Sequence, residues 1–130
     1  MAGDGRSRME LDPRLENLAT ARRFVRERLD DAPPGVVADI EIIASELLTN
    51  AVEHGPPGPL SIAVVRHDST VSLTVDSPRP DPHLPAPETW AMADVNEITG
   101  RGLAIVRRLA DDVSVDQTAT SLSITATRSF

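Results

Sequence analysis

The chain has 130 residues, no cysteine and a formal net charge of −7, from 13 basic and 20 acidic residues. This length fits one domain with its own core, and the lack of cysteine excludes disulfides and zinc–cysteine sites. The negative charge argues against a nucleic-acid partner, because phosphate backbones would be repelled. The first residues, MAGDGRSRMELDPR, are charged where a signal peptide needs an apolar run, and no segment has the ~18 apolar residues that span a bilayer. We therefore expect a cytoplasmic protein that binds neither nucleic acid nor membrane.

The N-terminal part of the chain predicts a polar segment followed by a helix. Residues 1–12 form either a flexible N-terminus or a short edge strand around Met9–Leu11. From Pro13, apolar residues at helical spacing predict an amphipathic helix that ends before Pro33. Its apolar residues are Leu15, Leu18, Ala21, Phe24, Val25 and Leu29, and its arginines, including Arg22 and Arg26, lie largely on the other side.

A second helix is predicted from about Val37 to His54. Its apolar stripe is wide enough to be mostly buried, and Gly55, followed by two prolines and another glycine, ends it. The stripe consists of Ile40, Ile42, Ile43, Leu47, Leu48, Ala51 and Val52.

Two strands are expected next, at Leu60–Arg66 and Val71–Val75, because their residues alternate or are β-branched. Residues 67–70 would join them as a hairpin turn. Five prolines between Ser77 and Pro87 then exclude a helix or an inner strand. A loop of this length in a small domain is usually functional.

The C-terminal part predicts a third helix, at about Gly102–Ala110, and two more strands at Val113–Val115 and Leu122–Thr127. This order favours an α+β fold, a two-layer sandwich with helices on one face of a mixed, mainly antiparallel sheet. Residues 13–130 would form the single domain.

The second helix carries a polar stripe that needs an explanation. Glu46, Asn50 and His54 are spaced i, i+4 and i+8, so they lie along one side of the helix. A carboxylate and an amide on a mostly buried helix need a partner or a function. The stripe is either a binding or catalytic site, or a structural hydrogen-bonded pair at an exposed edge.

Two further features could carry chemistry. Gly100 and Gly102 flank Arg101 where the third helix begins, and glycines with free N–H groups at a helix start favour a phosphate. Asp76 ends the second hairpin strand, where a carboxylate can accept a hydrogen bond from an exocyclic amine. Each feature alone is also typical of an ordinary turn.

Together, these segments resemble the nucleotide-binding boxes of the GHKL (Bergerat-fold) ATPases, which include gyrase, histidine kinases and the ninety-kilodalton heat-shock chaperone. The chain is most similar to the stand-alone bacterial anti-sigma-factor serine/threonine kinases. The matching segments are SELLTNAVEHG at Ser45–Gly55, TGRGLAIV at Thr99–Val106 and ARRFVRERL at Ala21–Leu29. The resemblance extends over nearly the whole chain.

The resemblance implies a role for each matching residue. Asn50 would ligate Mg²⁺ and Glu46 would act as a general base, while residues 77–99 would form a lid over ATP. Asp76 would recognise the adenine, with Thr120 near it, and His54 would lie near the phosphates or have a structural role. The residues that would line the triphosphate are Gly100, Arg101, Gly102 and Leu103.

The chain departs from the family pattern at two places. Prolines stand at positions 78 and 80, where the family often has the glycines of an Asp-x-Gly-x-Gly box, and Ala119 to Ser121 replace the usual glycine before the last strand. Proline has no backbone donor, so these changes predict a looser or rearranged adenine site and place turnover in question.

The leading hypothesis from the resemblance is an ATP-dependent anti-sigma factor. It would act as a homodimer, sequester a sigma factor and phosphorylate a serine or threonine of an anti-anti-sigma antagonist. A nucleotide-binding regulatory module without kinase activity is the alternative. A detached histidine-kinase catalytic domain fits less well, because the chain is too short to carry a dimerisation helix pair with a phosphoacceptor histidine.

Overall fold

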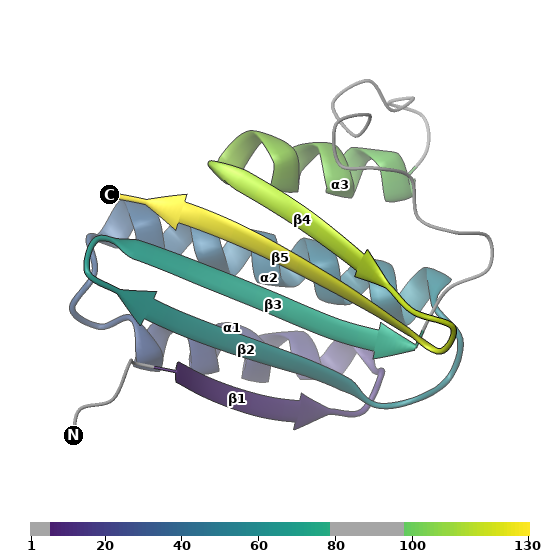
Figure 1. Ribbon diagram of the computed structural model, residues 1–130. Helices are drawn as coiled ribbons and strands as arrows, with labels where there is room; N and C mark the ends of the chain where they lie inside the picture. Colours follow the sequence, from purple (N-terminus) through teal and green to yellow (C-terminus); the bar gives the residue numbers. More distant parts are fainter. Residues whose placement is uncertain (1–5, 79–97) are drawn as a thin grey trace.

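The computed structural model describes residues 6–78 and 98–130, in which five antiparallel strands form one sheet with helices against one face (Figure 1). The strand order is β1-β2-β3-β5-β4. The other face of the sheet has no helix from the described ranges against it. This arrangement confirms the predicted two-layer α+β sandwich, and every strand pair in these ranges is antiparallel.

The strands extend beyond their predicted bounds because backbone pairing continues past the apolar residues that reveal them. A two-residue turn joins β2 to β3, and its Asp68 has φ 52°, a conformation that aspartate tolerates better than most residues. The N-terminal segment forms β1, the edge strand paired with β2. The strands are β1 Arg6–Leu11, β2 Leu60–His67, β3 Thr70–Pro78, β4 Asp112–Gln117 and β5 Ser121–Ser129.

The first predicted helix is divided. A short 3₁₀ turn, Leu15–Asn17, precedes α1, Leu18–Arg28. The expectation that Leu15 packs inward is wrong, because the turn carries it away from the apolar face and its exposed fraction is 49%. Ala21, Phe24 and Val25 of α1 are buried as predicted, and Leu18 is half-buried.

The long helix α2, Pro34–His54, starts three residues before its predicted beginning because proline is compatible with a first helical turn. It ends at Gly55, where a Cβ atom would lie only 2.5 Å from the carbonyl oxygen of Ala51. Ile42 is 44% exposed and does not widen the buried stripe as expected. None of the helices within the described ranges is long and apolar enough to cross a membrane.

Helix α3, Ile98–Leu109, also starts earlier than predicted. Gly100 and Gly102 therefore lie inside its first turns and do not precede them. Glycine costs about 1 kcal/mol in a helix relative to alanine, and the burial of Leu103 and Val106 against the core offsets this cost. The predicted lid, residues 77–99, lies mostly outside the described residues; its ends belong to β3 and α3.

The core between the helices and the sheet is almost entirely aliphatic, and only 2% of the residues of the chain are aromatic. Each fully buried Leu, Ile or Val contributes roughly 1.5–3 kcal/mol relative to an exposed side chain. The largest fully buried residues are Leu29, Ile40, Ile43, Leu47, Leu48, Ile62, Leu73, Val25, Val64, Val71 and Val106.

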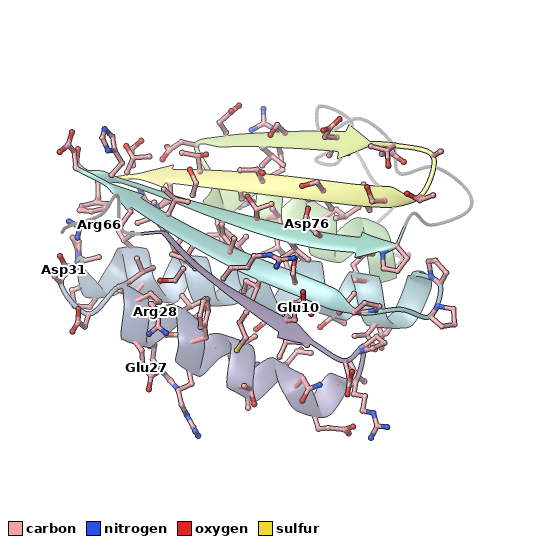
Figure 2. All side chains as sticks on the ribbon, turned by 60° about the horizontal axis from the view of Figure 1, so that its bottom comes forward. Glu10, Glu27, Arg28, Asp31, Arg66 and Asp76 are labelled. Atoms are coloured by element: carbon pink, nitrogen blue, oxygen red, sulfur yellow. The ribbon has the colours of Figure 1, made fainter. Side chains whose placement is uncertain are left out.

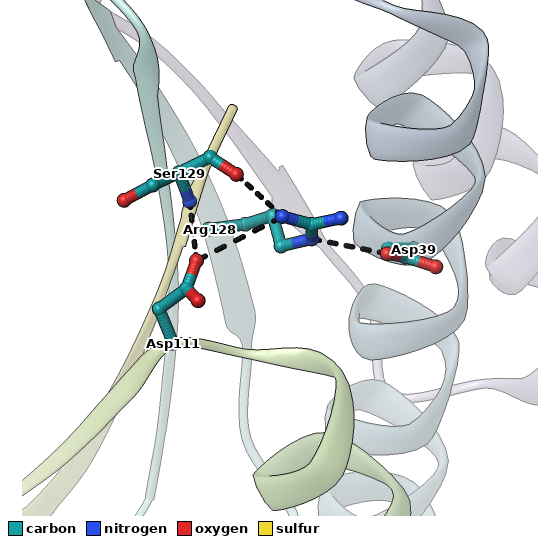
Figure 3. Close-up of polar contacts among 4 residues, drawn as sticks. All are labelled: Asp39, Asp111, Arg128 and Ser129. Atoms are coloured by element: carbon teal, nitrogen blue, oxygen red, sulfur yellow. Dashed lines mark hydrogen bonds and ion pairs between the residues drawn. The ribbon is translucent and has the colours of Figure 1, made fainter.

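Arg128 near the C-terminal end of β5 ties three elements together (Figure 3). Its Nε donates to the Asp39 carboxylate of α2 at 3.0 Å, and its guanidinium lies 3.8 Å from the Asp111 carboxylate between α3 and β4. Asp111 also accepts from the backbone N–H of Ser129 at 2.6 Å. The network holds the end of β5 against the first half of α2.

We predict that Arg128→Ala lowers the free energy of unfolding by about 1–2 kcal/mol, because charge-assisted hydrogen bonds of a part-buried group are lost. Chemical denaturation would measure this loss. The matched control is Arg8→Ala, which removes the exposed ion pair with Glu10 and should cost less than about 1 kcal/mol. Equal losses in the two variants would contradict the structural role of the network.

Candidate functional site

The polar stripe of α2 lies in the C-terminal half of this helix, at the same end of the molecule as the start of α3 and the end of β3 (Figure 1), and α2 contacts both elements. Glu46 and Asn50 are one helical turn apart and half-buried, and between them Leu47 and Leu48 are buried in the core. The same helix thus packs its apolar side inward and presents a carboxylate and an amide along another side.

Helix α3 comes into close contact with this stripe at Gly102. A Cβ atom on Gly102 would lie 2.7 Å from Glu46 Oε2, a distance that requires the carboxylate to move. Glycine at this position therefore allows α3 to approach the Glu46 side chain. Within the described ranges, the Glu46 carboxylate has no hydrogen bond or ion pair.

The Asn50 side chain has an unsatisfied group. Its Oδ1 atom is buried and has no hydrogen-bond partner among the described residues. A buried polar atom without a partner costs roughly 1–3 kcal/mol, so this oxygen is the kind of atom that a ligand or cation would satisfy.

The outer side of Glu46 borders an open depression of about 360 Å³ between α1 and α2. Arg22 of α1 donates to Ser45 Oγ at 3.3 Å, beside Glu46, and Arg26 pairs with Glu41 at 3.7 Å. The sequence predicts these arginines largely opposite the apolar residues of α1, and in the structure both reach side chains of α2. The i, i+4 spacing of Arg22 and Arg26 is the signal that places both on one helix face.

The other predicted residues are divided among several places. The side chains of His54, Gly100 and Arg101 lie outside what the structure describes. Leu103 is part of the core, and only its backbone is available to a ligand. Of Gly100 and Gly102, it is Gly102 that lies beside Glu46 in the described structure.

Asp76 points to the open face of the sheet. It accepts a hydrogen bond from Ser61 Oγ at 3.2 Å and, with Glu10, lines a pocket of about 280 Å³ at the strand ends (Figure 2). Thr120 lies in the wall of the same pocket. The described structure therefore places Asp76 and Thr120 together, but it does not bring Asp76 to Glu46 and Asn50. The role of Asp76 in adenine recognition stays a prediction.

A comparison with known protein families identifies the family to which this chain belongs. The sequence profile described as the histidine kinase-like ATPase domain matches residues 11–128. The chain belongs to this family. A comparison with curated proteins gives no match.

A solved structure has a similar fold to this histidine kinase-like ATPase domain. It contains the RsbU and RsbW domains of Rv1364c from Mycobacterium tuberculosis, and the TM-score is 0.72 at 23% sequence identity. The similarity covers 95% of this chain and 32% of that chain, so the present chain spans about a third of its length. At 23% identity, this similarity shows that the two folds are alike.

In an ATPase domain of this family, the groups to be held are a nucleotide and, in general, Mg²⁺. The residues present fit this cation: the Asn50 amide oxygen is a hard ligand that is already desolvated and unpartnered in the described structure. The described residues contain no cluster of three or more His, Cys, Asp or Glu that could bind a metal alone.

We predict that Asn50→Leu leaves the free energy of unfolding of the ligand-free protein unchanged or raises it by up to about 2 kcal/mol. The apolar side chain replaces a buried oxygen that has no partner, and denaturation without nucleotide or Mg²⁺ would measure the change. The matched control is Asn17→Leu, which loses the 2.9 Å hydrogen bond from Asn17 Nδ2 to Asp12 O and should be destabilised by about 1 kcal/mol. A loss of more than 1 kcal/mol in Asn50→Leu would mean that the amide has a structural partner.

Proposed function

We propose that the chain is an ATP-binding anti-sigma factor and serine/threonine protein kinase, which sequesters a sigma factor and phosphorylates an anti-anti-sigma antagonist. The observation that carries the proposal is the free Glu46 carboxylate, held beside Gly102 of α3 on one side and open to the depression between α1 and α2 on the other. The family membership and the resemblance of SELLTNAVEHG to the anti-sigma-factor kinases support it.

Asn50 is proposed to hold the cation through its buried amide oxygen, and the start of α3 to bind phosphates. Gly100 lies in the first turn of α3, where backbone N–H groups have no acceptor within the helix. When bound, Mg²⁺-ATP supplies the γ-phosphoryl group and neutralises the charge on its oxygens. The chain itself contributes the positions of Glu46, Asn50 and the start of α3 relative to one another.

Glu46 is proposed to be the general base. A serine or threonine hydroxyl of the antagonist would enter from the depression that Glu46 and Arg22 line. Glu46 would take the hydroxyl proton as that oxygen forms a bond to the γ-phosphorus, and the bond from the γ-phosphorus to the β-phosphate oxygen would break, which leaves ADP. Arg22 is held by Ser45 and places a positive charge at the entrance.

The proposed partners are proteins. The net charge of −7 suits a basic surface on a sigma factor, and acidic residues on the edge strand β4, Asp112 and Asp116, are exposed. The homodimer, the sigma factor and the antagonist are carried over from the resemblance. The protein is proposed to act in the cytoplasm, where its partners are.

A regulatory module that binds nucleotide without transferring phosphate is the second candidate. The proline at the end of β3, Pro78, favours it, because this residue and its counterpart at position 80 replace glycines of the family pattern. In this case nucleotide binding would order the protein for a partner and Glu46 would have no catalytic role.

Nucleotide binding is tested by calorimetric titration of ATP into the protein with and without Mg²⁺. We expect binding that depends on Mg²⁺ and weakens at least tenfold in Asn50→Ala, because the cation loses its protein ligand. Asn17→Ala, which alters an asparagine on the short 3₁₀ turn, should bind as the unaltered protein does. If ATP does not bind, both candidate functions are wrong and a protein-binding module without nucleotide is favoured.

Kinase activity is tested with labelled ATP and a candidate antagonist. Label transfer should fall at least a hundredfold in Glu46→Gln, because the amide cannot accept the proton, while ATP affinity changes little. Glu53→Gln is the matched control, since Glu53 is an exposed glutamate of the same helix. ATP binding without label transfer to any antagonist would favour the regulatory module.

A further inference from the structure

The alternation of β3 turns the side chains of the neighbours Asp76 and Ser77 to opposite faces of the sheet, while both residues border the same pocket at the strand end. Successive side chains of a strand point to opposite faces of a sheet. The buried residues Val71, Leu73, Val75 and Ser77 alternate with the half-buried Ser72, Thr74 and Asp76. The first three buried residues belong to the core beneath the helices, so Ser77 continues the helix-facing series.

The second series belongs to the open face, which hydroxyl pairs identify. Ser72 Oγ lies 3.2 Å from Thr127 Oγ1, and Thr74 Oγ1 lies 2.9 Å from Thr125 Oγ1, across the β3–β5 pairing. Asp76 follows in the same row and is bound by Ser61 of β2. Its carboxylate therefore lies on the face opposite to α2 and α3.

The candidate site lies on the helix side, because Glu46 and Asn50 belong to α2 and Gly102 belongs to α3. A nucleotide held by these residues has to extend along the helix side of the sheet. The last helix-facing side chain of β3 is Ser77, which is only 8% exposed and has no side-chain hydrogen bond among the described residues. It pairs with Leu122 of β5, which is also buried.

We infer that Ser77, and not Asp76, is the residue of β3 that contacts the nucleobase, and that the site consequently discriminates weakly between adenine and guanine nucleotides. This inference rests on the proposed nucleotide binding and adds its specificity. A hydroxyl both donates and accepts, so it can accept from the amino group of adenine or donate to the keto oxygen of guanine. A carboxylate only accepts, so it would favour adenine and reject the keto oxygen.

The test is titration of Mg²⁺-ATP and Mg²⁺-GTP into the unaltered protein and four variants. We expect the two dissociation constants of the unaltered protein to lie within about tenfold of each other. Ser77→Ala should weaken both by roughly threefold to tenfold, which is the range for one neutral hydrogen bond. Ser77→Asp should raise the preference for ATP at least tenfold.

The other two variants alter the open face. Asp76→Asn should leave both dissociation constants within twofold of those of the unaltered protein. Ser72→Ala should do the same; Ser72 is the matched serine of the same strand, and its hydroxyl is hydrogen-bonded to Thr127. Circular dichroism and thermal unfolding of each ligand-free variant check that it folds. If Ser77→Asp is unfolded, the comparison of Ser77→Ala with Asp76→Asn decides.

Three results would overturn the inference while leaving the proposed function intact. The first is a tenfold loss of ATP affinity in Asp76→Asn with no change in Ser77→Ala, and the second is unchanged affinity for both nucleotides in all Ser77 variants. A strong preference of the unaltered protein for ATP, above a hundredfold, would also overturn it. If the unaltered protein binds neither nucleotide, the proposed function fails and the inference fails with it.

Discussion

The close approach of α3 to α2 at Gly102 is the contact on which the candidate site depends. The space that a Cβ atom would need at this position is taken by Glu46 Oε2, 2.7 Å away. The apolar residues that follow, Leu103 and Val106, are buried in the core and hold α3 in place. Hydrophobic packing thus supplies the stability of the helix pair, while the missing side chain leaves room for a carboxylate at its surface.

The same arrangement contains two polar side chains, Glu46 and Asn50, that contribute little to the stability of the ligand-free fold. Glu46 has no partner in the described parts of the chain, and the buried Oδ1 of Asn50 is unsatisfied there. An apolar pair at these positions would suit the neighbouring residues Leu47 and Leu48, which are buried in the core. Proteins retain such locally unfavourable choices at functional sites and compensate for them elsewhere. Here the aliphatic core and the Arg128 network tie α2 firmly to the sheet.

The sheet separates two chemical environments. On β3, its helix face is apolar until the last residues of the strand, where Ser77 introduces a hydroxyl. Its open face carries serine and threonine pairs between β3 and β5 and the Ser61–Asp76 hydrogen bond. Because side chains alternate with a period of two, a single residue decides on which side a carboxylate lies. That constraint separates Asp76 from the helix-side residues of the site.

Much of this protein was determined by local sequence. The helices and strands, the α+β sandwich and the polar stripe of α2 follow from periodicity, which neighbouring residues encode by themselves. The alternation of residues 71–77, VSLTVDS, also indicates on which side of the sheet Asp76 lies. Only the tertiary structure decided that α3 begins at Ile98, that Leu15 is exposed, and that Gly102 meets Glu46. These outcomes depend on which elements pack together, and that choice is set by burial summed over the whole chain, which no single segment contains.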